Sequence, residues 1–347
     1  MPSILKKKQF WGGLIAAGIL VFLFYDLDLP RILELARHIR LVYLLPVLVC
    51  TTLLIVFKSL RWKIIVSRVR KVLFWPTLSL YATSQLIGVL LPALTGQAGR
   101  VILFSRKGNF SKTYCFSTIF LEVVLDGAGL IMLMLLSSSV FVFPSQYRFV
   151  SYIIAGTTGF LLIMFYLSLN FQEKLEALGY RKLRRRSLKV FLVLRKFLRS
   201  FNDGISVMKS TDKLLVVSVL TFLSWASHIV SVYFLFYMFN LNLPIWAAVV
   251  VIIINYLALM VPITPGNIGS FQLAVVGGLN IFSVPKTEAV LFSVVLYLVD
   301  MLPMLALSAF FLFTEHFSLS EISGDEELLE VERMVVESDV AVKEEKP

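Results

Sequence analysis

Charged side chains are scarce in this chain, and that scarcity limits the class of protein it can be. Asp, Glu, Lys and Arg make up only 16% of the 347 residues, whereas hydrophobic residues make up 58% and the mean hydropathy is +0.84. A soluble domain of this length could not hide so much apolar surface, so a soluble fold is excluded and lipid is the expected solvent. The composition predicts an all-α polytopic membrane protein.

Cysteine and histidine are also few, with two and three residues respectively. Cys50 and Cys115 lie in or beside apolar runs and are expected to be inert packing residues. The histidines are scattered, so no metal site is predicted, and His228 is expected to be a hydrogen-bonded interior residue. The sequence contains no Walker A, GxSxG or HExxH pattern. We therefore expect no cofactor, no metal and no catalytic residue.

The charges that are present are unevenly distributed. Residues 315–347 hold 11 of the 22 acids against three basic residues, whereas residues 1–314 hold 30 Lys and Arg against 11 Asp and Glu. The acidic segment has few aromatic residues and no long apolar run, which is typical of a disordered, solvating tail. The expected domains are a membrane domain over 1–314 and a largely disordered cytoplasmic tail over 315–347.

Basic segments between the apolar runs predict the topology. Lys and Arg gather in 58–71 with six, in 100–112 with four and in the loop 170–213 with twelve, and the positive-inside rule places all three in the cytoplasm. Lys6-Lys7-Lys8 places the N-terminus inside, and the run after it lacks a small-residue cleavage site, which predicts a retained first helix in the cell membrane. The C-terminal tail then also lies inside. The apolar runs cover about 10–25, 41–57, 72–94, 113–143, 149–169, 214–239, 244–262, 268–283 and 289–313.

Two of these runs are interrupted by the same arrangement of proline and glycine. LPALTGQAGR (91–100) and VPITPGNIGS (261–270) both read Pro-x-x-x-Gly-[Gln/Asn]-x-Gly, and Gln85 and Asn255 stand seven residues before the first proline of each. Because 72–94 lies between two cytoplasmic segments, it must enter the membrane and return. The prediction is six full transmembrane helices plus two opposed re-entrant helical hairpins in an inverted repeat, as in many transporters. The alternative is that the two turns arose independently.

The broken helices predict where a polar ligand binds. Irregular backbone at membrane depth is tolerated only where protein buries it or where it lines a wet cavity, and N–H groups at a helix start suit an anion such as phosphate. Arg100 could pair with a phosphate or with an acid, and a purely structural kink is the alternative. The expected binding or translocation residues of the two motifs are Gly96, Gln97, Gly99, Arg100, Pro265, Gly266, Asn267, Gly269 and Gln272, with Gln85 and Asn255 as secondary candidates.

Carboxylates inside apolar runs form a second group of candidates. Glu122 and Asp126 are spaced i, i+4 on one face of the run 113–143, and Asp300 lies inside the run 289–313. Such carboxylates are costly and indicate function by default. Glu122 or Asp126 could carry a proton, be coupled to transport, or hold Arg100 in a buried ion pair. Arg61 is a secondary candidate, although Arg61-Trp62 also fits a snorkelling arginine beside an interfacial tryptophan.

The basic loop predicts a lipid partner. From Arg181 to Arg199 it interleaves basic residues with Leu, Val and Phe, which suits an interfacial amphipathic helix on anionic lipid. Nucleic acid is not expected, because the basic cluster is an inside loop of a membrane protein. A second copy of the chain or a partner enzyme could dock through this loop or through the acidic tail.

Together these motifs resemble one known family. The chain looks like a member of the flippase-like family named for the lysylphosphatidylglycerol synthase transmembrane region, which includes the membrane half of the multiple peptide resistance factor and stand-alone relatives. The resemblance covers roughly residues 10–315 and rests on Arg61-Trp62, LPALTGQAGR, Glu122 with Asp126, and PGNIGSFQ (265–272). It implies translocation of a lipid or a lipid-linked sugar.

The chain departs from the family pattern at three positions. The family commonly carries Glu where this chain has Gln97 and Gln272, and Arg where it has Val123. Neutral side chains thus replace two carboxylates and one guanidinium at the expected centre. These replacements set the chain apart from its relatives in the charges available to a headgroup.

Three functions remain open at this point. The first, and the one expected, is a lipid translocator that moves a phospholipid or polyprenyl-phosphate-linked headgroup across the cytoplasmic membrane. The second is a membrane component of aminoacyl-phosphatidylglycerol synthesis. In the two-part relatives the synthase activity belongs to a soluble catalytic domain, so this chain, which closes on an acidic tail, is not expected to be an enzyme. The third is a non-transporting membrane scaffold.

Overall fold

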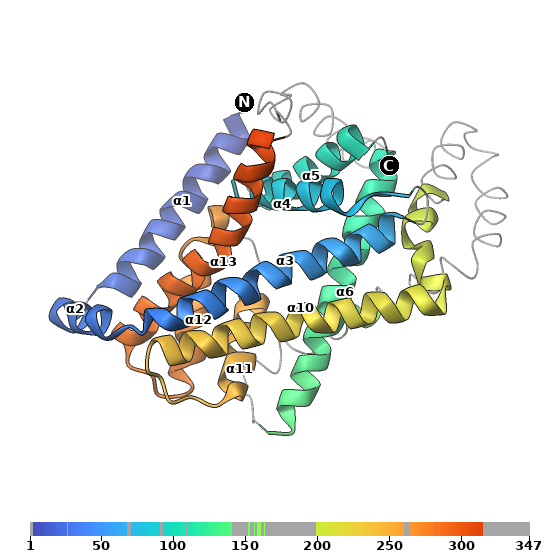
Figure 1. Ribbon diagram of the computed structural model, residues 1–347. Helices are drawn as coiled ribbons and strands as arrows, with labels where there is room; N and C mark the ends of the chain where they lie inside the picture. Colours follow the sequence, from blue (N-terminus) through green and yellow to red (C-terminus); the bar gives the residue numbers. More distant parts are fainter. Residues whose placement is uncertain are drawn as a thin grey trace, which may run out of the picture.

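The computed structural model describes most of the membrane domain, and every regular element in the described part is a helix (Figure 1). The all-α fold class is therefore confirmed for these residues. Most of the predicted run 149–169, most of the basic loop 170–213 and the tail 315–347 lie outside the described residues. The described residues are 3–25, 27–67, 71–90, 93–108, 110–140, 152, 156, 158–160, 163, 199–259 and 264–314.

Four helical segments are long and apolar enough to cross a membrane: Leu41–Val66, Lys112–Ser138, Thr211–Met238 and Lys286–Thr314. The first joins the short helix η1 (Leu41–Tyr43) to α3 (Leu44–Val66), and the others are α6, α10 and α13. Each coincides with a predicted crossing. Large apolar side chains on their outer faces are exposed, as expected for side chains that contact lipid. The chain is thus a multi-pass membrane protein.

Two pairs of shorter helices stand between the long ones. α4 (Phe74–Leu90) packs against α5 (Ala93–Gly108), and α11 (Ile245–Leu259) packs against α12 (Ser270–Asn280). A helix needs roughly 20 apolar residues to cross the hydrocarbon core, and each of the four is shorter than that. The order long, short, short, long therefore occurs twice in the described chain, first from α3 to α6 and then from α10 to α13.

The apolar core is centred on α11. Its residues from Ala247 to Ile254 are all buried, and the surrounding side chains come mainly from α6, α10, α12 and α13. A helix that is apolar and buried on every side lies inside the bundle and not at its lipid face. Gly278 of α12 lets that helix approach closely, because a Cβ there would lie 3.2 Å from the Cα of Val251.

Long helices hold these pairs in place. The most extensive helix–helix contact joins α3 and α10, which run alongside each other, with α4 and α5 above them and α11 below in the view of Figure 1. The predicted first run is helix α1 (Ser3–Phe24), which contacts α12 and the turn before it. Two short elements complete the described chain, α2 (Leu29–His38) and η2 (Ser206–Lys209).

Helix α2 is tied to the start of α13 by charge. The carboxylate of Asp28 accepts a hydrogen bond from the backbone N–H of Arg31 and so caps the helix. The guanidinium of Arg31 then bonds Glu288 at 2.9 Å and Glu34 at 2.9 Å, and these hydrogen bonds raise the pKa of Arg31 above its usual value. Because Arg31 is exposed, this link orients α2 and contributes little to stability.

The two Pro-Gly motifs share a skeleton but not a conformation. Gly96 and Gly99 of the first motif lie inside helix α5. In the second motif a short helix, η3 (Pro265–Asn267), is followed by α12, and three residues have left-handed backbone: Gly266 (φ 60°), Asn267 (φ 58°) and Gly269 (φ 88°). The prediction that the two motifs form equal turns was therefore wrong for these glycines. Glycine has no Cβ and adopts helical and left-handed backbone alike, so the shared sequence pattern does not distinguish the two.

Candidate functional site

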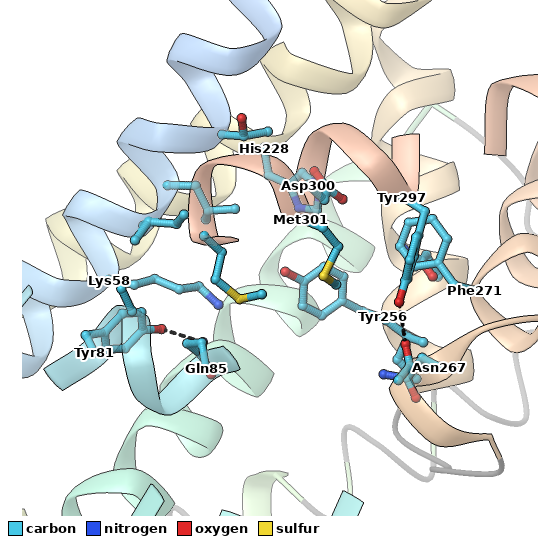
Figure 2. Close-up of a pocket in the computed structure, with 18 of the residues that line it drawn as sticks. Lys58, Tyr81, Gln85, His228, Tyr256, Asn267, Phe271, Tyr297, Asp300 and Met301 are labelled. Carbon is cyan, nitrogen blue, oxygen red and sulfur yellow. Dashed lines mark hydrogen bonds and ion pairs between the residues drawn. The ribbon is translucent and has the colours of Figure 1, made fainter. Parts of the chain in front are cut away.

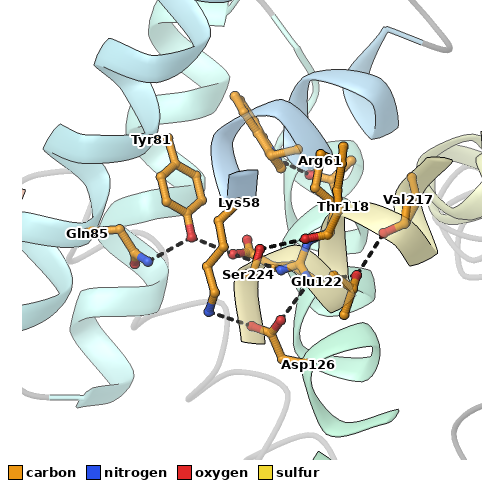
Figure 3. Close-up of polar contacts among 12 residues, drawn as sticks. Lys58, Arg61, Tyr81, Gln85, Thr118, Glu122, Asp126, Val217 and Ser224 are labelled. Carbon is orange, nitrogen blue, oxygen red and sulfur yellow. Dashed lines mark hydrogen bonds and ion pairs between the residues drawn. The ribbon is translucent and has the colours of Figure 1, made fainter. Parts of the chain in front are cut away.

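A network of buried ion pairs joins α3, α5 and α6 (Figure 3). Asp126 accepts from Arg61 at 2.7 Å and from the ammonium of Lys58 at 3.0 Å. Glu122 lies 3.0 Å from the guanidinium of Arg100 and 3.6 Å from that of Arg61. Of the alternatives for Arg100, pairing with an acid is the one that the structure shows, and Glu122 is that acid.

The position of Arg61 corrects one sequence interpretation. Its side chain is 0% exposed, and Trp62 is buried against the ring of Phe104 at 3.9 Å between centroids, so neither side chain extends out of the protein. Helix α3 continues to Val66, well past the apolar run that ended at 57, and Arg61 therefore lies in that helix and not in a loop.

Lys58 is the residue of the network that sequence reasoning missed, since it was counted as part of the basic segment 58–71. A usable signal was present. Lys58 and Arg61 are spaced i, i+3, so both point to one face of a helix, and a facing helix carries the i, i+4 pair Glu122 and Asp126. These two spacings match when the two helices face each other, as the structure shows they do.

Neutral side chains extend the network towards α4. The hydroxyl of Tyr81 donates to Glu122 at 2.8 Å, and the amide of Gln85 donates to the oxygen of Tyr81 at 3.0 Å. Arg100 also lies over the ring of Tyr81, 5.8 Å from its centroid. Tyr81 is fully buried. It bonds Glu122 of the network and also forms part of the wall of a cavity, so it links the two.

That cavity has a volume of about 320 Å³ and lies inside the helical bundle (Figure 2). Figure 2 shows Lys58, Tyr81 and Gln85 together on one side, and Asn267, Phe271 and Tyr297 on the other. Gln85 and Asn255, which the sequence pairs by their distance from the two motifs, both line it. The lining residues come from α3, α4, α10, α11, α12, α13 and the second motif: Thr51, Leu54, Ile55, Lys58, Tyr81, Ala82, Gln85, His228, Asn255, Tyr256, Leu259, Thr264, Gly266, Asn267, Phe271, Tyr297, Asp300, Met301 and Met304.

A second pair of titratable groups lines the same cavity. The Nε2 atom of His228 on α10 lies 3.4 Å from a carboxylate oxygen of Asp300 on α13, and the imidazole packs edge-on against Tyr256. His228 is buried as predicted. Neither of its ring nitrogens has a hydrogen-bond partner within the described chain, so the expected hydrogen bond is not found there.

The second motif forms part of the cavity wall and is held by its own hydrogen bonds. Tyr297 donates to the carbonyl of Gly266 at 2.8 Å, and the side-chain oxygen of Gln272 accepts from the N–H of Gly269 at 2.7 Å. Gln272 thus caps α12 and lies outside the cavity lining. Gly269 packs against α1, where a Cβ would lie 3.2 Å from the carbonyl oxygen of Ala16.

The remaining candidates lie away from the cavity or outside the description. Val123, at which the resemblance leads one to expect an arginine, is 51% exposed. Gly96 and Gln97 belong to α5, and Gly99 is half-buried beside Arg100 on the same helix. The side chains of Gln97 and Pro265 are not among those described.

Fold and site together define a multi-pass helical membrane protein with a cavity between its helices, to whose wall polar and charged side chains contribute. The chain belongs to the family of the lysylphosphatidylglycerol synthase TM region, whose sequence profile matches residues 9–308. A UPF0104 membrane protein of Methanocaldococcus jannaschii is 27% identical over 190 residues, which cover 55% of this chain and 77% of that protein. No solved structure matches the chain.

Proposed function

We propose that the protein is a lipid translocator in the cell membrane, and that the cavity receives the anionic headgroup of a phospholipid or of a polyprenyl-phosphate-linked lipid. The observation that carries the proposal is Lys58. Its ammonium belongs to the wall of a cavity inside the bundle while Asp126 holds it at 3.0 Å. An ammonium that a carboxylate holds in place in a cavity wall suits phosphate, because hydrogen bonds between ionised groups are stronger than those between neutral groups.

The size of the cavity supports a headgroup and not a whole lipid. Ligand sites commonly enclose about 300–1,000 Å³, and this one, at about 320 Å³, is at the lower end. In the proposal the acyl chains stay in the bilayer while the headgroup occupies the cavity. The amides of Gln85, Asn255 and Asn267 offer donors and acceptors for its hydroxyl groups.

The proposed architecture is the one expected from the sequence. The pairs α4–α5 and α11–α12 would be re-entrant hairpins that enter from opposite faces and meet at the cavity, between six full crossings. Support comes from the short lengths of these helices and from the residues of α4, α11 and α12 in the cavity wall. Transporters with inverted repeats bind substrate near the midplane between such broken helices.

The test is lipid movement in proteoliposomes that contain fluorescent headgroup-labelled phosphatidylglycerol or a labelled polyprenyl phosphate. We expect bleaching of inner-leaflet label by an external reductant in vesicles with protein, and none in empty vesicles. Loss of a charge-assisted hydrogen bond costs about 1.5–3 kcal/mol, so Lys58→Met should slow movement about tenfold or more. Lys63→Met, on the same helix and outside the network, should not.

Movement no faster than in empty vesicles, with both lipid classes, would reject a translocator. A separate assay tests the alternative of lipid modification, since in this proposal the chain moves a lipid and does not alter it. A new aminoacylated species in lipid extracts from cells that express this chain alone would favour the enzyme.

A further inference from the structure

His228 and Asp300 form the second charged feature of the cavity, separate from the network around Lys58. They come from different long helices, α10 and α13, and approach to 3.4 Å across the bundle. The imidazole is buried, and the second carboxylate oxygen of Asp300 is enclosed without a hydrogen-bond partner in the described chain. Nothing in the proposed binding of phosphate by Lys58 uses this pair.

The acids of the network are poorly suited to carry a proton. Asp126 accepts from both Lys58 and Arg61, and Glu122 accepts from Tyr81 and Arg100. Protonating either carboxylate would leave a buried cation without its counter-charge, which is strongly unfavourable. These two acids therefore serve to position the cations.

The environment of His228 and Asp300 is different. The titratable and charged groups that face the cavity from the neighbouring elements are Lys58 on α3, Tyr81 on α4, Tyr256 on α11 and Tyr297 on α13. Lys58 is the one cation among these, and Asp126 holds it. An ionised carboxylate without a paired cation is costly inside a protein, and imidazole changes charge closest to neutral pH of all side chains. The pair thus places an imidazole beside a carboxylate that no described cation other than His228 contacts.

We propose that the His228–Asp300 pair is a proton-binding site that couples proton movement to the headgroup. The inference rests on the proposed function. With no proton the pair carries a charge of −1 and repels an anionic headgroup in the same cavity; with one proton it is neutral and the headgroup enters. The proton comes from water on one side and returns to water on the other, and no other bond is made or broken. Proton and headgroup therefore cross together, and a proton gradient drives net lipid movement.

The experiment uses the full chain in proteoliposomes with an enclosed pH-sensitive dye and a labelled anionic lipid, with and without a gradient from about pH 6 to about pH 8, a range that spans imidazole titration. For the unaltered protein we expect net lipid movement towards the alkaline side, together with acidification of that side. Asp300→Asn mimics the protonated carboxyl group, so lipid should still equilibrate but no longer follow the gradient, and acidification should be lost. His228→Gln removes the imidazole but leaves the carboxylate of Asp300, which repels the headgroup, so lipid movement should fall both with and without the gradient.

Glu288→Gln is the matched control, because this carboxylate lies at the start of the same helix and bonds Arg31 outside the cavity. It should retain both gradient-driven movement and acidification. If the unaltered protein moves lipid equally with and without the gradient, the coupling is wrong and the translocator stands. If it moves no lipid under any condition, the translocator itself fails. Size-exclusion profiles identify any variant that is misfolded. If a variant is misfolded, the measurements on the unaltered protein with and without the gradient still test the coupling.

Discussion

Arg61 is the most enclosed cation of the ion-pair network, and its removal should show how such pairs act on stability. Arg61 donates to Asp126 at 2.7 Å and lies 3.6 Å from Glu122, but each acid keeps a second cation, Lys58 or Arg100. Loss of a hydrogen bond to a charged group costs about 1.5–3 kcal/mol, so Arg61→Met should destabilise the protein by about that amount in a thermal or denaturant unfolding curve in detergent. Adding Asp126→Leu should cost about 3–5 kcal/mol more, because Lys58 is then left without its carboxylate. A double variant that recovers stability would contradict this account.

Gly269 is the residue at which backbone conformation and packing coincide. Its φ of 88° and the 3.2 Å separation of a built Cβ from the carbonyl of Ala16 both oppose a side chain. A strained backbone of this kind costs about 1–3 kcal/mol, so Gly269→Ala should lower the stability by that amount and loosen α1. Gly18→Ala on α1 is the control, since nothing lies within 4 Å of its Cβ position. Equal thermal unfolding temperatures of the two variants would show that the left-handed turn carries no strain.

The individual residues show what sequence can and cannot predict at this scale. Glu122 and Asp126 were predicted because a carboxylate in an apolar run stands out by its cost, and Arg100 was correctly weighed as a partner for an acid. Lys58 was not predicted, because a hydropathy profile ends a helix at its first charged residues, whereas helix α3 continues through residues whose charges are paired. The unfavourable burial of a charge can be read from one segment of sequence. The opposite charge that offsets it can be found only when the facing helix is known.

At the scale of elements, contact between α6 and α10 depends on Gly129. A Cβ at this position would overlap the indole nitrogen of Trp225, whose ring contacts Tyr256 of the cavity wall at 4.7 Å between centroids. Gly129→Ala should therefore displace Trp225, destabilise the protein by about 1–3 kcal/mol and slow lipid movement. The loss of stability should be smaller in the double variant Gly129→Ala with Trp225→Phe, because phenylalanine lacks the indole nitrogen that a Cβ at position 129 overlaps.

The control for that comparison is Leu135→Ala on the same helix, because Leu135 faces outward and is exposed in the described chain. Its stability and transport should match those of the unaltered protein. Strictly additive effects of Gly129→Ala and Trp225→Phe would show that the two positions are not coupled and that close approach of the helices does not set the cavity wall.

The two motifs illustrate the limit of sequence comparison at the element scale. The same Pro-x-x-x-Gly skeleton stands beside a helical glycine in α5 and beside left-handed residues in the turn before α12. Glycine permits both conformations, so a glycine in the sequence predicts a flexible choice of backbone dihedral angles but does not predict which conformation is adopted. The left-handed backbone of Asn267 and the capping role of Gln272 follow from the packing of α12 against its neighbours, which one motif does not encode.

For the whole molecule, composition and hydropathy were sufficient for the all-helical membrane class and for four helices of spanning length. The repeated order of long and short helices agrees with the predicted repeat, and Gln85 and Asn255 meet in one cavity as their matched positions suggested. Hydropathy could not define that cavity. Its wall is assembled from six helices and a turn, and a polar residue on a single apolar helix does not reveal which neighbours share its environment.

The orientation of the helix pairs gives the last prediction, which concerns the topology of the whole chain. In a background with Ser at Cys50 and Cys115, single cysteines can replace exposed residues at the two ends of each pair: Lys71 and Lys107 for α4–α5, and Asn242 and Asn280 for α11–α12. Because a re-entrant pair returns to the face it entered, a membrane-impermeant maleimide should label the first two from one side only, expected to be the cytoplasm, and the last two from the other. Labelling of Lys71→Cys and Lys107→Cys from opposite sides would mean that α4–α5 crosses the bilayer, and the opposed hairpins would have to be abandoned.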